Sequence, residues 1–181
     1  MSNSLWLSLI LTMTFINNSI ANAVSISKNN QNIEVSERFE SEDWTLMSIT
    51  GKPVTLSEYQ GQPVLLVFWA TWCPYCKKLL PGIAKLHEKY QSQGLKVIGV
   101  NIKEDWQPAI YWRNHGYQFD TVLDGDDIAN KYGIIGTPGL VFISPKGKVL
   151  NVAHFSDPSH PSLEKFAQHF LSDPLKTVSE N

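Results

Sequence analysis

The sequence predicts one α/β domain over residues 44–172, with a mainly parallel central sheet and helices on both of its faces. Two observations support this prediction. Continuous apolar runs of strand length, typical of strands buried on both faces, alternate with segments whose apolar residues recur at helical spacing. Such alternation is the pattern of a parallel sheet covered by helices. With 43% hydrophobic and 18% charged residues, the 181-residue chain has an ordinary globular composition.

Turn residues divide the domain into its expected elements. Gly51-Lys52-Pro53 predicts the turn of a small N-terminal hairpin. Ser144-Pro145-Lys146-Gly147 predicts the turn of a terminal hairpin, which is expected to add antiparallel strands at the edge of the sheet. The expected strands are 44–49, 54–56, 64–70, 95–100, 119–123, 139–143 and 148–154.

Helices are expected where apolar residues share one face of a 3.6-residue period. The clearest case runs from Pro74 to about Gln91, where Gly94 follows the predicted end. The expected helical segments are a single turn at 57–60, then 74–91, 105–115, 126–132 and 159–171.

The two ends of the chain are predicted to lie outside the domain. Residues 1–23 hold an apolar, uncharged run that ends in Ala21-Asn22-Ala23, a small-x-small pattern typical of signal peptidase cleavage. A cleaved signal peptide is therefore expected, and an uncleaved membrane anchor is the alternative. Residues 24–43 are polar and predicted to be a flexible entry to the domain, and 173–181 a C-terminal tail. The protein is expected to be periplasmic or otherwise extracytoplasmic.

The chain has only two cysteines, Cys73 and Cys76, and their spacing indicates redox chemistry. A disulfide between positions i and i+3 closes almost no loop, so it would add little stability. A zinc site, the alternative, wants four ligands, and neither a second cysteine pair nor a histidine cluster accompanies these two. No metal and no cofactor other than a redox-active disulfide is expected.

The position of the pair supports this interpretation, because a buried strand turns into a helix there. Cys73 is expected at the helix N-terminus, where unpaired N–H groups and the helix dipole favour a thiolate. Pro74 suits the first helical position because it needs no N–H partner. Cys73 is then predicted to be the exposed attacking sulfur and Cys76 the more buried resolving one.

The segment Phe68-Trp69-Ala70-Thr71-Trp72-Cys73-Pro74-Tyr75-Cys76-Lys77 resembles the active site of the thioredoxin superfamily. Pro81 and Gly147 also fall where that family has its helix-kinking proline and a hairpin glycine. The resemblance covers about residues 44–172 and implies a thioredoxin fold. The N-terminal hairpin, together with an extra helix and strand between Val100 and Asp124, is most similar to the exported TlpA/ResA-like branch.

The resemblance also implies a client-binding surface. Gly136-Thr137-Pro138 resembles the family's cis-proline loop, so the Thr137–Pro138 bond is expected to be cis, with Thr137 extended beside Cys73. Trp72, Pro74 and Tyr75 are predicted to contact clients with Thr137, whereas Trp69 is expected in the core. Trp106 and Trp112, at near-helical spacing, are expected to serve packing, with a client groove as the alternative.

One departure from ordinary thioredoxins concerns proton transfer. Val67 occupies the position of their buried Asp, so another group must serve Cys76. Val100-Asn101-Ile102-Lys103-Glu104 resembles a ResA-like pattern whose Glu lies near the cysteines. Glu104 is therefore the candidate, with a pKa expected to be raised by partial burial; a solvated helix-capping role is its alternative.

The function implied is thiol–disulfide exchange on exported proteins, most simply as a reductant, with cytochrome c maturation as a candidate setting. A thiol oxidant or isomerase is the close alternative, because sequence does not fix a reduction potential. A peroxiredoxin-type peroxidase expects Thr where Ala70 stands, and a redox-inert binding module would not need the cysteine pair. Exported clients and a membrane thiol donor are the expected partners of a monomer; a net charge of −2 gives no reason to expect nucleic acid.

Overall fold

The computed structural model describes residues 38–171. Seven of its eight strands and its four α-helices follow the order expected from the sequence, with boundaries that differ by a few residues, and the first strand was not expected. The strands are β1 (Phe39–Glu40), β2 (Thr45–Met47), β3 (Pro53–Thr55), β4 (Val64–Trp69), β5 (Lys96–Asn101), β6 (Asp120–Val122), β7 (Gly139–Ile143) and β8 (Lys148–Ala153). The helices are α1 (Pro74–Tyr90), α2 (Pro108–His115), α3 (Asp126–Lys131) and α4 (Pro161–Leu171), with 3₁₀ turns η1 (Leu56–Tyr59) and η2 (Gln91–Gln93).

The central sheet is mixed, which corrects the expectation of a mainly parallel one. Its six strands lie in the order β1-β8-β7-β4-β5-β6. Only the β4–β5 and β5–β6 pairs are parallel, whereas β4–β7, β7–β8 and β8–β1 are antiparallel. Apolar composition did not reveal strand direction because β4 and β7 are buried on both faces in either orientation.

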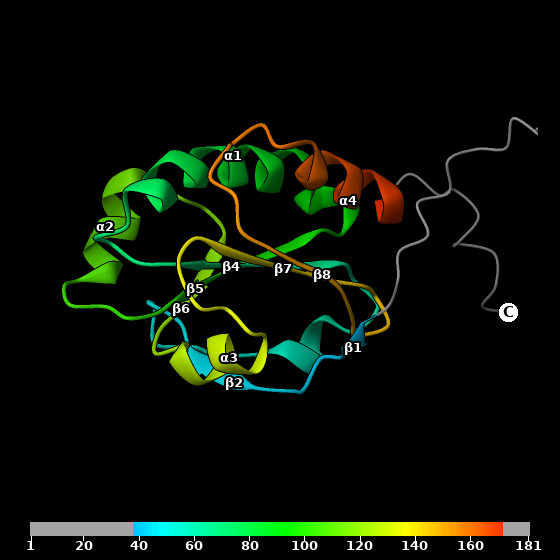
Figure 1. Ribbon diagram of the computed structural model, residues 1–181, viewed down its shortest axis with the longest axis horizontal. Helices are drawn as coiled ribbons and strands as arrows, with labels where there is room; N and C mark the ends of the chain where they lie inside the picture. Colours follow the sequence, from blue (N-terminus) through cyan, green and yellow to red (C-terminus); the bar gives the residue numbers. More distant parts are fainter. Residues whose placement is uncertain (1–37, 172–181) are drawn as a thin grey trace, which may run out of the picture. The chain divides into compact units, whose positions relative to one another are not determined.

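Helices cover both faces of this sheet, as expected (Figure 1). On one face α1, α2 and α4 pack over a core that includes Leu79, Trp112 and Phe166. On the other face α3 and the β2–β3 hairpin enclose a second core that includes Trp44 and Ile128. The strand β4 contributes to both cores, because its side chains alternate between the two faces.

The domain begins earlier than residue 44, because β1 adds a strand to the sheet. Phe39 pairs with Val149 and Glu40 with Lys148, so this part of the segment 24–43 is ordered by the sheet rather than flexible. The predicted signal peptide (1–23), residues 24–37 and the predicted tail (173–181) lie outside the described residues. None of the helices between residues 38 and 171 is long and apolar enough to cross a bilayer.

The strand register brings the predicted site together from three distant parts of the sequence. Trp69, at the end of β4, pairs with Asn101 at the end of β5. Phe68 pairs with Gly139, the first residue of the antiparallel strand β7. Three segments therefore lie together at the same end of these strands: those that follow β4 and β5, and the loop that precedes β7.

Gly82 in α1 makes room for the segment that connects β8 to α4, which crosses the helix in Figure 1. A Cβ atom on Gly82 would lie 2.2 Å from the carbonyl oxygen of Pro158 and 2.6 Å from its Cα. We expect Gly82→Ala to lower the free energy of unfolding by about 2 kcal/mol, because this overpacking outweighs alanine's better helix propensity.

Urea denaturation measures this effect. Gly136→Ala is the matched control, because a Cβ there meets no atom within 4 Å. Equal urea midpoints for the two variants would show that the crossing segment does not constrain position 82.

Candidate active site

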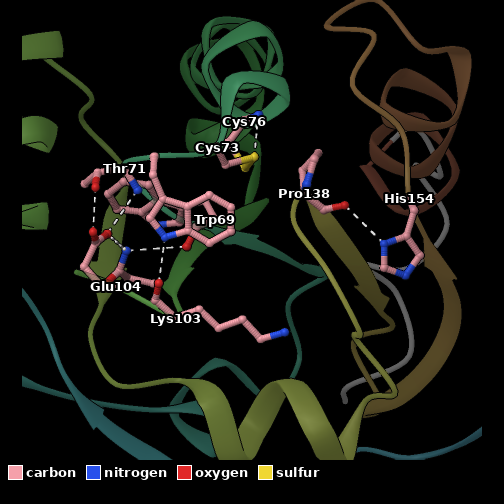
Figure 2. The surroundings of a disulfide bond; sticks show 10 residues. Trp69, Thr71, Cys73, Cys76, Lys103, Glu104, Pro138 and His154 are labelled. Atoms are coloured by element: carbon pink, nitrogen blue, oxygen red, sulfur yellow. Dashed lines mark hydrogen bonds between the residues drawn. A yellow bond between two sulfur atoms is a disulfide. The ribbon is translucent and has the colours of Figure 1, made fainter. Parts of the chain in front are cut away.

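The two cysteines lie where β4 leads into α1. Cys73 is the N-cap of α1, and Pro74 occupies its first turn. The structure contains a Cys73–Cys76 disulfide with a Cα–Cα distance of 5.3 Å. The sulfur of Cys73 accepts a hydrogen bond of 3.0 Å from the backbone N–H of Cys76 (Figure 2). This N–H belongs to the first helical turn, whose donors have no partner within the helix, so the helix itself stabilises charge on the Cys73 sulfur.

The expected difference in exposure between the two cysteines is wrong. Cys73 exposes 2% of its surface and Cys76 exposes 1%. Both belong to the core cluster beneath α1, together with Trp69 and Leu140. In this disulfide form, the hydrogen bond to Cys73 distinguishes the two sulfurs, and exposure does not.

An aromatic rim surrounds the buried disulfide. Trp72 is 49% exposed and Tyr75 is 63% exposed, and Pro74 between them is also exposed. The indole N–H of Trp72 donates to the carbonyl oxygen of Lys103 at 2.7 Å. Trp69 is fully buried, as expected, with its indole N–H bonded to Thr121. The tryptophans of the motif thus divide between core and rim.

The loop before β7 forms the other side of the site. The Thr137–Pro138 peptide bond is cis, as expected. Pro138 is buried, and Figure 2 shows it on the opposite side of the disulfide from Glu104. The carbonyl oxygen of Pro138 lies 3.2 Å from Nδ1 of His154, which follows β8 and was not among the predicted site residues.

A hollow of about 350 Å³ lies beside this loop. It is open to solvent and mainly apolar, and it contains the predicted client-contact residues Tyr75 and Thr137. Its lining residues are Tyr75, Ile135, Gly136, Thr137, Pro138, His154, Phe155 and Ser156. Ile135 is 87% exposed there. It was not among the predicted site residues, because a single apolar residue in a loop belongs to no motif or periodic pattern.

Glu104 holds the loop between β4 and the cysteines. Its carboxylate accepts hydrogen bonds from the backbone N–H and hydroxyl of Thr71, at 3.0 and 2.5 Å. It also accepts from the side-chain amide of Asn101 at 2.8 Å and from the backbone N–H groups of Asp105 and Trp106, both at 3.1 Å. Figure 2 shows Glu104 beside Thr71, two residues before Cys73.

The pKa expected for Glu104 is wrong in direction. Burial raises the pKa of this carboxyl group, but the hydrogen bonds from Thr71, Asn101 and Asp105 lower it, and the net shift is below its ordinary value. Glu104 is therefore ionised at neutral pH. Thr71 and Asn101, which produce this shift, were not predicted as site residues, although Asn101 is a buried polar residue at the end of an apolar strand.

Trp106 and Trp112 also differ in burial. Trp112 is buried and its ring lies 4.6 Å from that of Trp69, so it serves packing as expected. Trp106 is 59% exposed and precedes α2, which corrects the expectation that it packs in the core.

The chain is similar to known proteins. Residues 39–152 match the AhpC/TSA family. This chain belongs to the AhpC/TSA family of thioredoxin-like proteins. Within the family it is 32% identical over 147 residues to the thiol-disulfide oxidoreductase ResA of Bacillus subtilis, covering 80% of this chain and 79% of that protein. It is 30% identical over 128 residues to ResA of Halalkalibacterium halodurans, covering 70% and 72%.

A solved structure has a similar fold. A thiol:disulfide interchange protein DsbE from Chlorobium tepidum has a TM-score of 0.66 and 29% identity, covering 73% of this chain and 95% of that one. The thioredoxin fold with its N-terminal hairpin is thereby confirmed. The protein is a thiol–disulfide oxidoreductase of the ResA/DsbE type.

Proposed function

We propose that this oxidoreductase works as a reductant of disulfides in exported proteins. The environment of its cysteines supports this direction. The first turn of α1 stabilises a Cys73 thiolate, but the burial of both cysteines among apolar residues opposes it. The hydrogen bond to the Cys73 sulfur comes from a backbone N–H rather than from a cationic side chain, so the thiolate is only weakly stabilised. Strong oxidants of this chemistry owe their potential to a stabilised thiolate form, so a weakly stabilised thiolate favours a reductant.

The reaction proceeds by two exchanges. The Cys73 thiolate attacks one sulfur of a client disulfide, forms a mixed disulfide and releases the other client sulfur as a thiolate, which takes up a proton. Cys76 loses its proton and attacks Cys73, which releases the second client thiol and forms the Cys73–Cys76 disulfide. Two electrons pass to the client, and a dithiol donor, proposed to be a membrane protein, returns them.

The rim places the client for this attack. Trp72, Pro74, Tyr75 and Thr137 are proposed to contact the chain around the client cysteine, with Tyr75 and Thr137 in the hollow beside the loop before β7 and Pro138 beside the reacting sulfurs. An extended segment can then pair with exposed backbone groups of the loop before β7. The predicted signal peptide at 1–23 supports the proposal that this activity lies outside the cytoplasm.

A redox titration against glutathione tests the direction. We expect the Cys73–Cys76 couple to have a reduction potential below about −250 mV, close to that of a reducing thioredoxin at about −270 mV. A potential near about −120 to −180 mV, the range of strong oxidants and isomerases, would overturn the proposal and support the oxidant or isomerase alternative.

The client class is proposed from the resemblance to TlpA/ResA-like proteins, which act on the cysteines of apocytochrome c. A c-type haem attachment site has the pattern Cys-x-x-Cys-His. An oxidised peptide with this pattern should be reduced faster than a peptide of the same composition whose two cysteines lie farther apart. Equal rates for the two peptides would remove cytochrome c maturation as the specific role.

A further inference from the structure

Lys103 lies between the two sides of the site and contacts both. Its carbonyl oxygen accepts the indole N–H of Trp72 at 2.7 Å, and its Nζ donates to the carbonyl oxygen of Ile135 at 3.2 Å. Figure 2 shows its side chain extending from the Glu104 side of the site toward the strand that follows Pro138.

A third contact fixes the backbone of this residue. The N–H of Lys103 donates to Asp126 in the first turn of α3, at 3.1 Å to one carboxylate oxygen. The segment that follows α3 continues into the loop containing Ile135 and Pro138. Lys103 is therefore bonded to the cysteine motif, to α3 and to the loop before β7.

The backbone conformation of Lys103 is unusual for its residue type. Its φ angle of +50° lies in the left-handed region, which is sterically unfavourable for residues with a side chain. Glycine would adopt it without this penalty. Unfavourable conformations of this kind occur at functional sites, where the side chain or backbone direction is needed. At Lys103 the conformation directs the carbonyl group to Trp72 while the ammonium group reaches Ile135.

We propose that Lys103 is a positioning residue that sets the spacing between the two apolar sides of the client site. Trp72, on one side, and Ile135, on the other, are both exposed large apolar residues. A polypeptide client that contacts both residues would span these two sides, so its binding depends on the spacing between them. Lys103 thus favours disulfides within a polypeptide over small disulfides, which need no contact with either side; this inference rests on the proposed function.

Steady-state reduction of two substrates, with dithiothreitol as electron donor, tests this role. One substrate is a cyclic peptide disulfide of about a dozen residues, and the other is bis(2-hydroxyethyl) disulfide. Lys103→Met keeps the backbone bonds but loses the bond to Ile135. We expect it to raise KM for the peptide about fivefold, the effect of losing one hydrogen bond, with kcat and the rate on the small disulfide unchanged.

Three further variants complete the test. Lys103→Arg should restore the peptide KM, because it keeps a cationic donor of similar reach. Lys103→Gly should raise the peptide KM as Lys103→Met does without lowering the thermal midpoint, since glycine tolerates the left-handed conformation. Lys85→Met, an exposed lysine about three turns along α1 from Cys73, should behave as wild type on both substrates.

The outcomes separate the inference from the proposed function. An unchanged peptide KM in Lys103→Met, or equal losses on both substrates, would overturn the positioning role while leaving the reductase activity in place. If the wild-type protein reduces neither disulfide, the proposed function fails and this inference fails with it.

Discussion

Cys76→Ser is expected to accumulate mixed disulfides with client proteins, whereas Cys73→Ser is expected to accumulate none. Cys73 is the helix N-cap, and its sulfur accepts the N–H of Cys76, so it carries the attacking thiolate. Without Cys76 the mixed disulfide has no internal thiol to resolve it. Both variants should lose turnover by roughly a thousandfold or more, because each removes one of two obligatory sulfurs.

Non-reducing electrophoresis and mass spectrometry of proteins trapped on each variant measure this difference. Serine is a strong N-cap residue, so Cys73→Ser should keep the start of α1 and remain folded. The double variant Cys73→Ser/Cys76→Ser is the control for non-covalent association. Equal trapping by the two single variants would show that either sulfur can attack and would contradict the assignment.

Glu104→Gln is expected to slow exchange about tenfold, because it loosens the loop that carries the cysteines. Glutamine has one accepting oxygen where the carboxylate has two, so it cannot accept from Thr71 and Asn101 on the second oxygen. The free energy of unfolding should fall by about 1–2 kcal/mol, since water replaces part of what is lost.

The pH profile distinguishes this structural role from proton transfer. The lowered pKa of Glu104 keeps its carboxylate ionised near neutral pH. The exchange rate of Glu104→Gln should therefore be lower than that of wild type by the same factor at every pH from 5 to 9. A changed profile shape would support a general base instead. Asp105→Asn, at the neighbouring exposed carboxylate, is the matched control and should keep the wild-type rate.

Stability also depends on this charge. Because the folded pKa of Glu104 lies below its unfolded value, its stabilising effect is present above the unfolded pKa and is lost as pH falls through the folded pKa. The difference in stability between wild type and Glu104→Gln should therefore shrink in acid.

Local patterns in the sequence predicted most of the site. Cys73 and Cys76 are three residues apart, and they stand with Pro74 where an apolar strand pattern changes to a helical one. These two observations together predicted a redox pair at the N-terminus of a helix. The cis bond before Pro138 was predicted only through resemblance, because most bonds before proline are trans. The hairpin, the helices and the alternation of apolar runs were visible because each has its own periodicity.

Contacts between distant segments were not predictable in this way. The two residues of β1 carry no strand pattern, and their order comes from pairing with Val149 and Lys148, more than 100 positions later. The pKa of Glu104 depends on Thr71, 33 positions away, and its direction reversed once those donors were known. The antiparallel β7–β8 hairpin was expected from its turn, but the antiparallel pairing of β4 with β7 was not, because a buried apolar run has the same composition beside a parallel or an antiparallel neighbour.

The burial of both cysteines affects which molecules can exchange electrons with the protein. Attack on a disulfide requires access to a sulfur atom, and here 2% and 1% of the two residues are exposed. Low-molecular-weight thiols in the surroundings should therefore exchange with the pair more slowly than a docked protein does, and reach equilibrium with it only at high concentration or after long incubation. The oxidation state of the protein is then set by the rate at which partner proteins dock and reach the sulfurs. It can therefore differ from the oxidation state that the small thiols of its compartment would impose at equilibrium.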